Sequence, residues 1–143
     1  MFLYRVGNYF YRKNLNFIAL FFNLLIRLFK NSAVYCQTEI GVGTIFGYGG
    51  IAIVIHKNAV IGKDCVIGSC VTIGGRSKSV RVPVIGNNVY ISTGAKVLGD
   101  IRVGNNVVIG ANSVVINDVP DNCIVAGVPA KVIRENIDPK DYY

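Results

Sequence analysis

An apolar residue returns every six positions through the middle of the chain, and a second small or branched residue follows it four places later. The first position is held by Ile55, Ile61, Ile67, Ile73, Ile85, Ile91, Val97, Val103, Ile109 and Val115. The second position is held by Cys65, Val71, Val89, Ala95, Ile101, Val107 and Ser113. A glycine often comes directly after the first position. A period of six fits neither an α-helix nor a single long strand.

This repeat predicts short strands joined by tight corners, where Gly and Asn supply the positive φ values that the corners need. Three strand-and-corner units close one triangular coil, and stacked coils form a parallel β-helix. We therefore expect an all-β solenoid of hexapeptide repeats over residues 36–134. A short N-terminal helical segment (residues 1–35) would precede it, and a C-terminal tail (residues 135–143) would follow.

The residues before the repeats carry a helical pattern. From Leu15 to Phe29 apolar residues recur at intervals of three and four, which predicts one broad apolar face. Asn23 and Arg27 interrupt this run, which is also shorter than the roughly 20 residues of a membrane-spanning helix. Two roles stay open: packing against the solenoid or sister subunits, and peripheral membrane association of residues 1–30 through a basic, aromatic-rich helix.

The repeat begins with a hexad at Ile40 and is interrupted twice. At Gly47–Gly50 (GYGG) the frame shifts by three residues, which predicts a loop or bulge. At 76–84 the count survives, but Ser79 stands where an aliphatic residue is expected, among several cations. We expect a loop that projects from one corner, either as a solvated basic loop or as an arm over a substrate or phosphate.

Composition narrows the chemistry. The net charge is +7, but Lys and Arg form no dense run, which argues against nucleic acid and favours a phosphorylated cofactor or an anionic surface. The four cysteines include no CxxC pair, and the chain has a single histidine, so we expect idle thiols in a reducing cytosol and no metal site. A zinc carbonic anhydrase would need three histidines around its metal.

Three motifs add a resemblance: VTIGG (Val71 to Gly75), TGAKVLG (Thr93 to Gly99) and AGVPAK (Ala126 to Lys131). With the repeats, they resemble the left-handed β-helix acyltransferases that use acetyl-CoA. Serine acetyltransferases and the small O-acetyltransferases of surface-polysaccharide clusters are the most similar. The likeness covers roughly residues 38–134 and implies a left-handed parallel β-helix. It also implies a homotrimer with acetyl-CoA in a groove between neighbouring solenoids, and direct transfer of acetyl to the acceptor oxygen.

The resemblance also directs attention to catalytic groups. Such enzymes use a histidine as general base, and His56 is the only candidate in this chain. When the motifs are aligned, the family's catalytic histidine falls on Gly49, the acid before it on Tyr48, and its Arg-His-Pro becomes Arg81-Val82-Pro83. We expect His56 to be catalytic, and Tyr48, Gly49 and Arg81 to bind the acceptor. The opposing hypothesis is that His56 lies at a corner without a catalytic role, while Tyr48 orients the acceptor.

For the cofactor, the resemblance implies backbone contacts near Ala95 and Ala111, where small side chains let the pantetheine arm lie flat. Gly127, Pro129 and Lys131 would lie at the end of the groove, and Lys131 would offer a point charge to a phosphate of CoA.

The function that we expect is transfer of acetyl from acetyl-CoA to a sugar hydroxyl in the biosynthesis of a surface polysaccharide such as capsule, O-antigen or exopolysaccharide. The location would be cytoplasmic, at the inner face of the cytoplasmic membrane if the acceptor is lipid-linked. One alternative is serine O-acetyltransferase in cysteine biosynthesis. An alternative of another class is a non-catalytic β-helix scaffold, but regular outward Thr rows are missing and AGVPAK is present.

Overall fold

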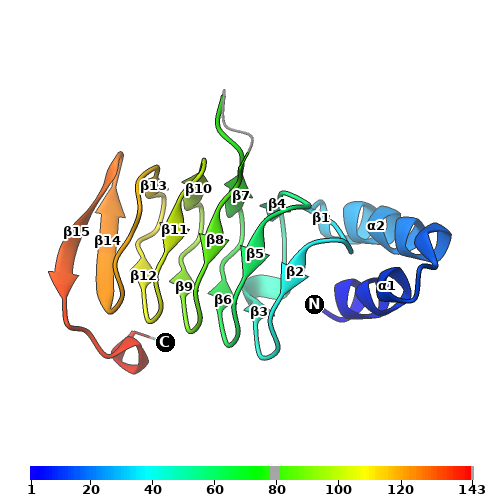
Figure 1. Ribbon diagram of the computed structural model, residues 1–143, viewed down its shortest axis with the longest axis horizontal. Helices are drawn as coiled ribbons and strands as arrows, with labels where there is room; N and C mark the ends of the chain where they lie inside the picture. Colours follow the sequence, from blue (N-terminus) through cyan, green and yellow to red (C-terminus); the bar gives the residue numbers. More distant parts are fainter. Residues whose placement is uncertain (78–80, 143) are drawn as a thin grey trace.

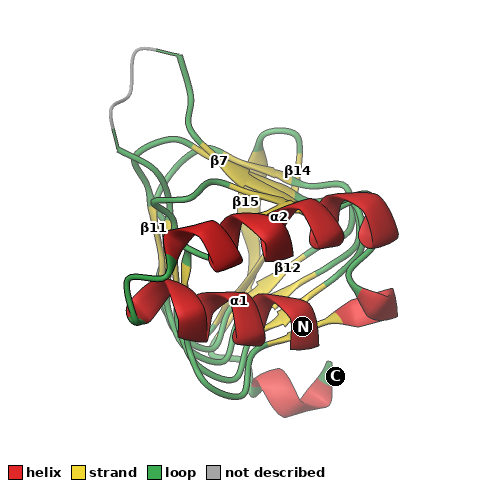
Figure 2. Cartoon of the chain, turned by 90° about the vertical axis from the view of Figure 1, so that its right-hand side faces the viewer, coloured by secondary structure: helices red, strands yellow, loops and turns green. Residues whose placement is uncertain are grey.

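The computed structural model describes residues 1–77 and 81–142 and consists of a pair of helices at one end of a three-sided coil (Figure 1). Helices α1 (Phe2–Arg12) and α2 (Asn16–Lys30) come first. Figure 2 shows them side by side across the end of the coil. Two 3₁₀ turns, η1 (Gly47–Gly49) and η2 (Pro139–Asp141), complete the helical elements of the described residues.

Three sheets form the sides of the coil. Sheet A consists of β1 (Ala33–Val34), β4 (Val54–Ile55), β7 (Thr72–Gly74), β10 (Lys96–Leu98) and β13 (Val114–Val115). Sheet B consists of β2 (Glu39–Ile40), β5 (Val60–Ile61), β8 (Val84–Ile85) and β11 (Arg102–Val103). Sheet C consists of β3 (Ile45–Phe46), β6 (Val66–Ile67), β9 (Tyr90–Ile91), β12 (Val108–Ile109), β14 (Cys123–Gly127) and β15 (Ala130–Glu135). Among the strands of the described residues only β14 and β15 pair antiparallel, so the predicted parallel β-helix is confirmed.

The hexad repeat produces the core because both of its apolar positions point inward. In sheet A, Ile55 pairs in register with Ile73, and Ile73 with Val97, and all three side chains are fully buried. The second position is buried as well, as Cys65 and Val89 show. Since burying one such side chain contributes roughly 1.5–3 kcal/mol, the stacked columns of Ile and Val account for the stability of strands only two or three residues long.

The glycines after the first repeat position have a different cause from the one predicted. Gly62, Gly86 and Gly104 do not have positive φ values. A Cβ atom at Gly62 would lie 2.6 Å from the backbone carbon of Gly86, and one at Gly86 would lie 2.7 Å from that of Gly104. These glycines are therefore required because the next coil passes too close for a side chain. Positive φ falls two residues later, at Asp64, Asn88 and Asn106.

Both interruptions of the repeat appear as insertions at corners. Ile55 follows Phe46 by nine residues, whereas Ile73 follows Ile67 by six, and the three extra residues form the turn η1. Between β7 and β8 the chain leaves the coil, and Figure 1 shows its described parts projecting from the corner. Of the predicted loop, Ser79 lies outside the described residues.

The N-terminal segment is helical as predicted, with a break at Lys13–Leu15, and the solenoid begins before the hexad at Ile40. Strand β1 already pairs with β4, and Val34 lies six residues before Ile40, in the frame of the first predicted hexad. The apolar face of α2 is narrower than predicted, since Leu15 and Phe29 are exposed. The helices are held to the first coil by the Tyr4 hydroxyl, which donates to Thr38 O at 2.6 Å.

Candidate functional site

The predicted site residues lie along the two edges of sheet A. We call the column of corners between sheets C and A the C–A edge, and the column between sheets A and B the A–B edge. Tyr48, Gly49, Ala111 and the β14–β15 hairpin lie on the C–A edge, whereas His56 and Arg81 lie on the A–B edge. A side of the coil has about five extended residues, so the two edges of one chain are roughly 15 Å apart.

The C–A edge is a ladder of corners with their backbones stacked on one another. Cys70 N–H donates to Ile51 O at 3.0 Å, Gly94 N–H to Ser69 O at 2.9 Å and Asn112 N–H to Thr93 O at 3.0 Å. The ammonium of Lys96 ties two of these corners together, since it donates to Cys70 O and Gly94 O, each at 2.8 Å. Apart from Tyr48 and Ile51, the side chains at these corners are mostly small, such as Ser69, Thr93 and Ala111, and we call this ladder the C–A track.

Tyr48 and Gly49 begin this edge in the turn η1. Both have positive φ values (49° and 72°), and the Tyr48 side chain is 78% exposed. A Cβ atom at Gly49 would lie 3.5 Å from the Lys30 ammonium nitrogen. Lys30 thus lies beside the position where the resemblance places the family's histidine. Gly49 and Lys30 both line a cavity of about 240 Å³ whose other walls are mostly apolar.

His56 lies on the A–B edge, directly after strand β4, and is half-buried. Its backbone N–H donates to Ile73 O at 2.8 Å, and its ring Nδ1 accepts a bond from the Asn58 N–H at 3.1 Å. Because Nδ1 is the acceptor, the proton of the neutral ring is on Nε2. In this conformation Nε2–H is a hydrogen-bond donor and the lone pair of Nδ1 is occupied by the bond from Asn58. The ring must turn away from Asn58 before Nδ1 can accept a proton.

Arg81 shares the A–B edge with His56. Its guanidinium lies 3.9 Å from a carboxylate oxygen of Asp100, and both side chains are exposed. Val60 N–H donates to Pro83 O at 3.3 Å, so the root of the loop lies against the coil that carries His56. An open cavity of about 320 Å³ lies on the same edge, lined by Arg76, Ser77, Leu98, Gly99, Asp100, Ile101 and Ile116.

The residues proposed for CoA form the far end of the C–A edge. Ala95 is fully buried, its N–H donates to Ser92 O at 3.2 Å and its C=O accepts from Thr72 N–H at 3.0 Å. Ala111 is exposed. Gly127 has a φ of 102° and donates its N–H to Ser113 Oγ at 3.1 Å, and the following Val128–Pro129 peptide is cis. Lys131 is exposed and pairs with Ala126 across the hairpin.

Three neighbours of the site did not emerge from sequence reasoning. Lys30 lies in a helix that the repeat does not include, and Asp100 and Lys96 occupy variable outward positions of the hexads. Which residues these side chains contact depends on which corners lie next to one another in the coil. The residues inserted at two corners change the spacing, so these neighbours cannot be found by counting along the sequence.

Three of the four cysteines, Cys36, Cys65 and Cys123, are buried and are not available as nucleophiles. Burial raises the pKa of Cys36 to about 11, and burial also raises the pKa values of Cys65 and Cys123, which keeps these thiols protonated at neutral pH. Within residues 1–77 and 81–142, no three His, Cys, Asp or Glu side chains lie close enough together to hold a metal ion.

Comparison with known proteins agrees with this architecture. The model for the family "Bacterial transferase hexapeptide (six repeats)" matches residues 83–117. A serine acetyltransferase of Synechococcus elongatus is 40% identical over 97% of this chain and 59% of its own length, and one of Helicobacter pylori is 36% identical over 93% and 78%. The structure of a Brucella abortus serine acetyltransferase in complex with coenzyme A superposes with a TM-score of 0.87 at 32% identity, over 93% of this chain and 54% of that one.

The three-sided coil is thus a left-handed parallel β-helix of hexapeptide repeats. The chain belongs to the hexapeptide-repeat transferase family, in which the relatives named here are serine acetyltransferases. It spans less than two thirds of the length of the first relatives that it matches, 59% of the Synechococcus protein and 62% of one from Bacillus pumilus.

Proposed function

We propose that the chain is an acetyl-CoA-dependent O-acetyltransferase. One observation carries the proposal: nearly the whole chain superposes on a serine acetyltransferase in complex with coenzyme A, and it keeps the small-residue C–A edge that ends in the AGVPAK hairpin. Ala111 and Gly127 would leave room for the pantetheine arm, and Lys131 would pair with a phosphate of CoA.

The site would be completed by a second copy of the chain in a homotrimer. His56 and Arg81 lie on one edge of sheet A and the C–A track lies on the other, so a single chain does not bring them together. A threefold arrangement would place the A–B edge of one copy against the C–A edge of the next. Apolar side chains face outward on every sheet, as shown by Ile45, Val54 and Val84, each more than 40% exposed, which supports such an assembly.

Within this site His56 would remove the proton from the acceptor hydroxyl. Its ring would first give up the bond from Asn58, which costs about 0.5–1.5 kcal/mol, the net contribution typical of such a bond. Nδ1 or Nε2 would then be free to accept the proton while the acceptor oxygen attacks the thioester carbonyl and CoA leaves as the thiol. A backbone N–H would have to stabilise the oxyanion.

Serine is the acceptor that the relatives favour, since those named here carry the name serine acetyltransferase. A sugar hydroxyl, in polysaccharide biosynthesis, is the second candidate, and a specific difference favours it. Tyr48 and Gly49 replace the acid and the histidine of the aligned family motif, and Val82 replaces a second histidine. Neutral groups at these places suit the hydroxyl groups of a sugar better than the charged ammonium of serine.

A turnover assay would test both acceptors. The purified protein is incubated with acetyl-CoA, and CoA release is followed with serine, with nucleotide sugars and without any acceptor. We expect acceptor-dependent release that drops by about 10²–10⁴ in His56→Ala, as is typical when a general base is lost. Release that is equal with and without every acceptor would contradict the proposed activity, and full turnover of His56→Ala would remove His56 from the mechanism.

A further inference from the structure

Helix α2 is apolar on two opposite faces, although it contacts the rest of the chain with only one. Ala19 and Ile26 are buried against α1 and the first coil. The opposite side carries a continuous stripe of exposed side chains at intervals of three and four: Phe17, Leu20, Phe21, Leu24 and Leu28. A helix that is apolar all round is typical of one covered by a further partner or by lipid.

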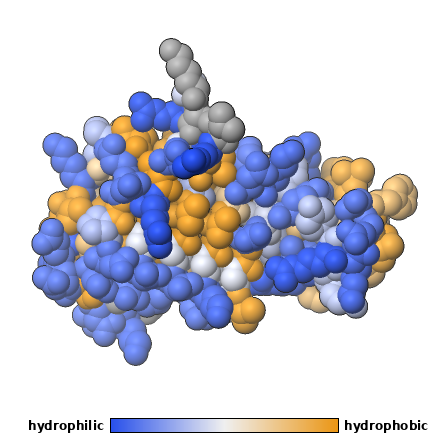
Figure 3. Space-filling view, viewed as in Figure 1, coloured by the Kyte–Doolittle hydropathy of each residue, from blue (hydrophilic) through white to orange (hydrophobic). Residues whose placement is uncertain are grey.

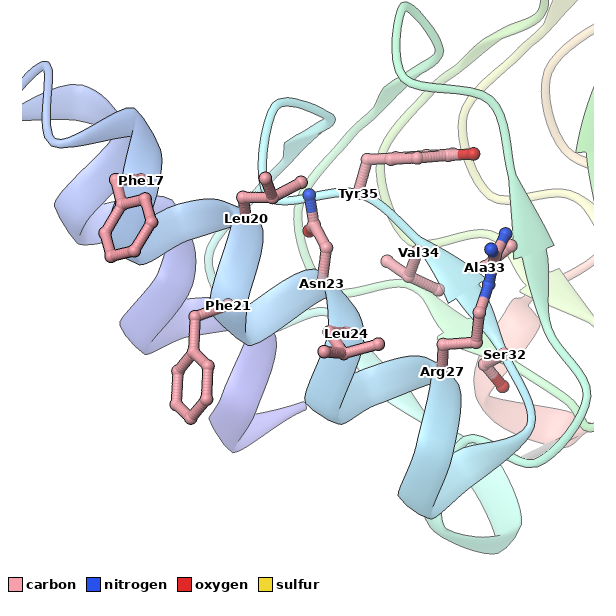
Figure 4. A pocket seen from close by; sticks show the side chains of 10 residues that line it. All are labelled: Phe17, Leu20, Phe21, Asn23, Leu24, Arg27, Ser32, Ala33, Val34 and Tyr35. Carbon is pink, nitrogen blue, oxygen red and sulfur yellow. The ribbon is translucent and has the colours of Figure 1, made fainter.

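The stripe borders a cavity of about 440 Å³ between α2 and strand β1. Figure 4 shows Leu20, Asn23 and Arg27 on the side of α2 that faces Val34 and Tyr35, whereas the Phe21 ring points away from that strand. In Figure 3 hydrophobic surface is visible at this helical end of the molecule. Phe17 is 86% exposed and Leu28 is 69% exposed, so this is a large apolar surface for a helix at the end of a solenoid.

The charged side chains of the two helices are all of one sign. No Asp or Glu precedes Glu39, whereas five Lys and Arg residues do. Arg5 is committed to the coil, because it donates to the carbonyls of Ile40 and Gly41 at 2.7 and 2.6 Å. The other four are exposed: Arg12 and Lys13 at the turn that leads into α2, Arg27 in the groove, and Lys30, whose ammonium is directed toward Gly49. Cations therefore lie at the N-terminal end of the apolar stripe and in the groove beside it.

We infer that the outer face of α2 docks on an anionic lipid surface. An amphipathic helix of this kind lies in the membrane interface, with its apolar side chains among the acyl chains and its cations near the headgroups. Neither helix of the described residues is long and apolar enough to cross a bilayer. The charges favour lipid over a second copy of the same face, which would bring these cations together with no carboxylate between them.

Co-sedimentation with vesicles tests this docking on the full chain. The vesicles consist of phosphatidylcholine alone or of an equal mixture with phosphatidylglycerol. We expect partitioning into the anionic vesicles only, weakened by salt, because each Lys or Arg near such a surface contributes about fivefold. Leu24→Glu should lower the partition coefficient by about tenfold or more, since it removes apolar area and adds a negative charge.

Val42→Glu is the matched control, since it makes the same change of charge at an exposed apolar residue outside the helices. We expect it to reduce binding by less than about threefold, because it adds the same charge away from the membrane surface. Equal effects of the two variants, or equal binding to both vesicles, would overturn the docking. A different result would be that the wild-type protein does not bind either kind of vesicle, while Leu24→Glu lowers the mass of the assembly in sedimentation velocity. In that case the face is an interface between copies of the chain, and the inference is wrong. Acetyl transfer is measured separately, so docking and the proposed activity fail independently.

Discussion

Gly62, Gly86 and Gly104 lie where successive coils stack closely, which makes Gly62→Ala the most informative change to the scaffold. A Cβ atom at Gly62 would lie 2.6 Å from both the backbone carbon of Gly86 and Asn87 Oδ1, and closer still to Gly86 O. Ordinary contact begins near 3.4 Å, so the next coil would have to move by almost 1 Å. Ladder hydrogen bonds hold that coil, such as Gly62 N–H to Ile85 O at 3.0 Å. Such overpacking costs about 1–3 kcal/mol or more.

For a chain of this length that loss lowers the melting temperature by about 4–12 °C. Gly74→Ala is the matched control, because nothing lies within 4 Å of a Cβ atom there and its φ is not positive. It should leave the melting temperature unchanged or raise it slightly, since replacing glycine lowers the entropy of the unfolded chain. Thermal unfolding followed by circular dichroism measures both. If Gly62→Ala melts with or above Gly74→Ala, the assignment of this glycine to close coil contact is wrong.

Three further predictions follow from particular side chains. Tyr4→Phe should cost about 1–3 kcal/mol, because the buried Thr38 carbonyl loses its donor. Burial raises the pKa of Tyr4 from 10.0 to about 12. The contribution of the neutral hydroxyl to the free energy of unfolding is therefore complete below pH 10 and is lost as the pH rises through 12. Urea titrations of the Tyr4→Phe variant should lack this pH dependence. In native protein Cys70, the one exposed cysteine, should react with iodoacetamide well before the other three, which mass spectrometry checks, and simultaneous labelling of all four would contradict the buried placement. Lys131→Ala should weaken CoA binding by about tenfold but leave dephospho-CoA unaffected if it pairs with the 3′-phosphate, and calorimetry with an unchanged CoA affinity would remove it from the site.

The hexad pattern predicted the solenoid well because its physical cause is local and repeated. Each Ile or Val at the first position faces the same core column, and each coil repeats that geometry. The prediction missed β1, although Val34 lies six residues before Ile40 and is buried like the other repeat residues. It also misjudged the glycines themselves, because contact with the next coil is not encoded in the local sequence of one corner.

The candidate site was predictable only in part. Motif resemblance selected Arg81 and the AGVPAK motif, and His56 was selected because it is the single histidine, but neither argument could say which edge of the coil each one occupies. The structure separates them across sheet A, since the three residues inserted at Gly47–Gly50 only enlarge one corner and leave His56 at the next. The hydrogen bond from Asn58 to the His56 ring depends on the conformation of a single turn, which no repeat pattern specifies.

Subunit complementation tests the central claim, a site shared between two edges of neighbouring chains, most directly. His56→Ala disables the A–B edge, and Ala111→Trp would block the C–A track at an exposed position. Each variant alone should lose acetyl transfer. Co-expressed in equal amounts, they should form mixed trimers in which about a quarter of the sites combine an intact A–B edge with an intact C–A edge. CoA release near a quarter of the wild-type rate is the predicted result, and a mixture as inactive as the separate variants would contradict a shared site.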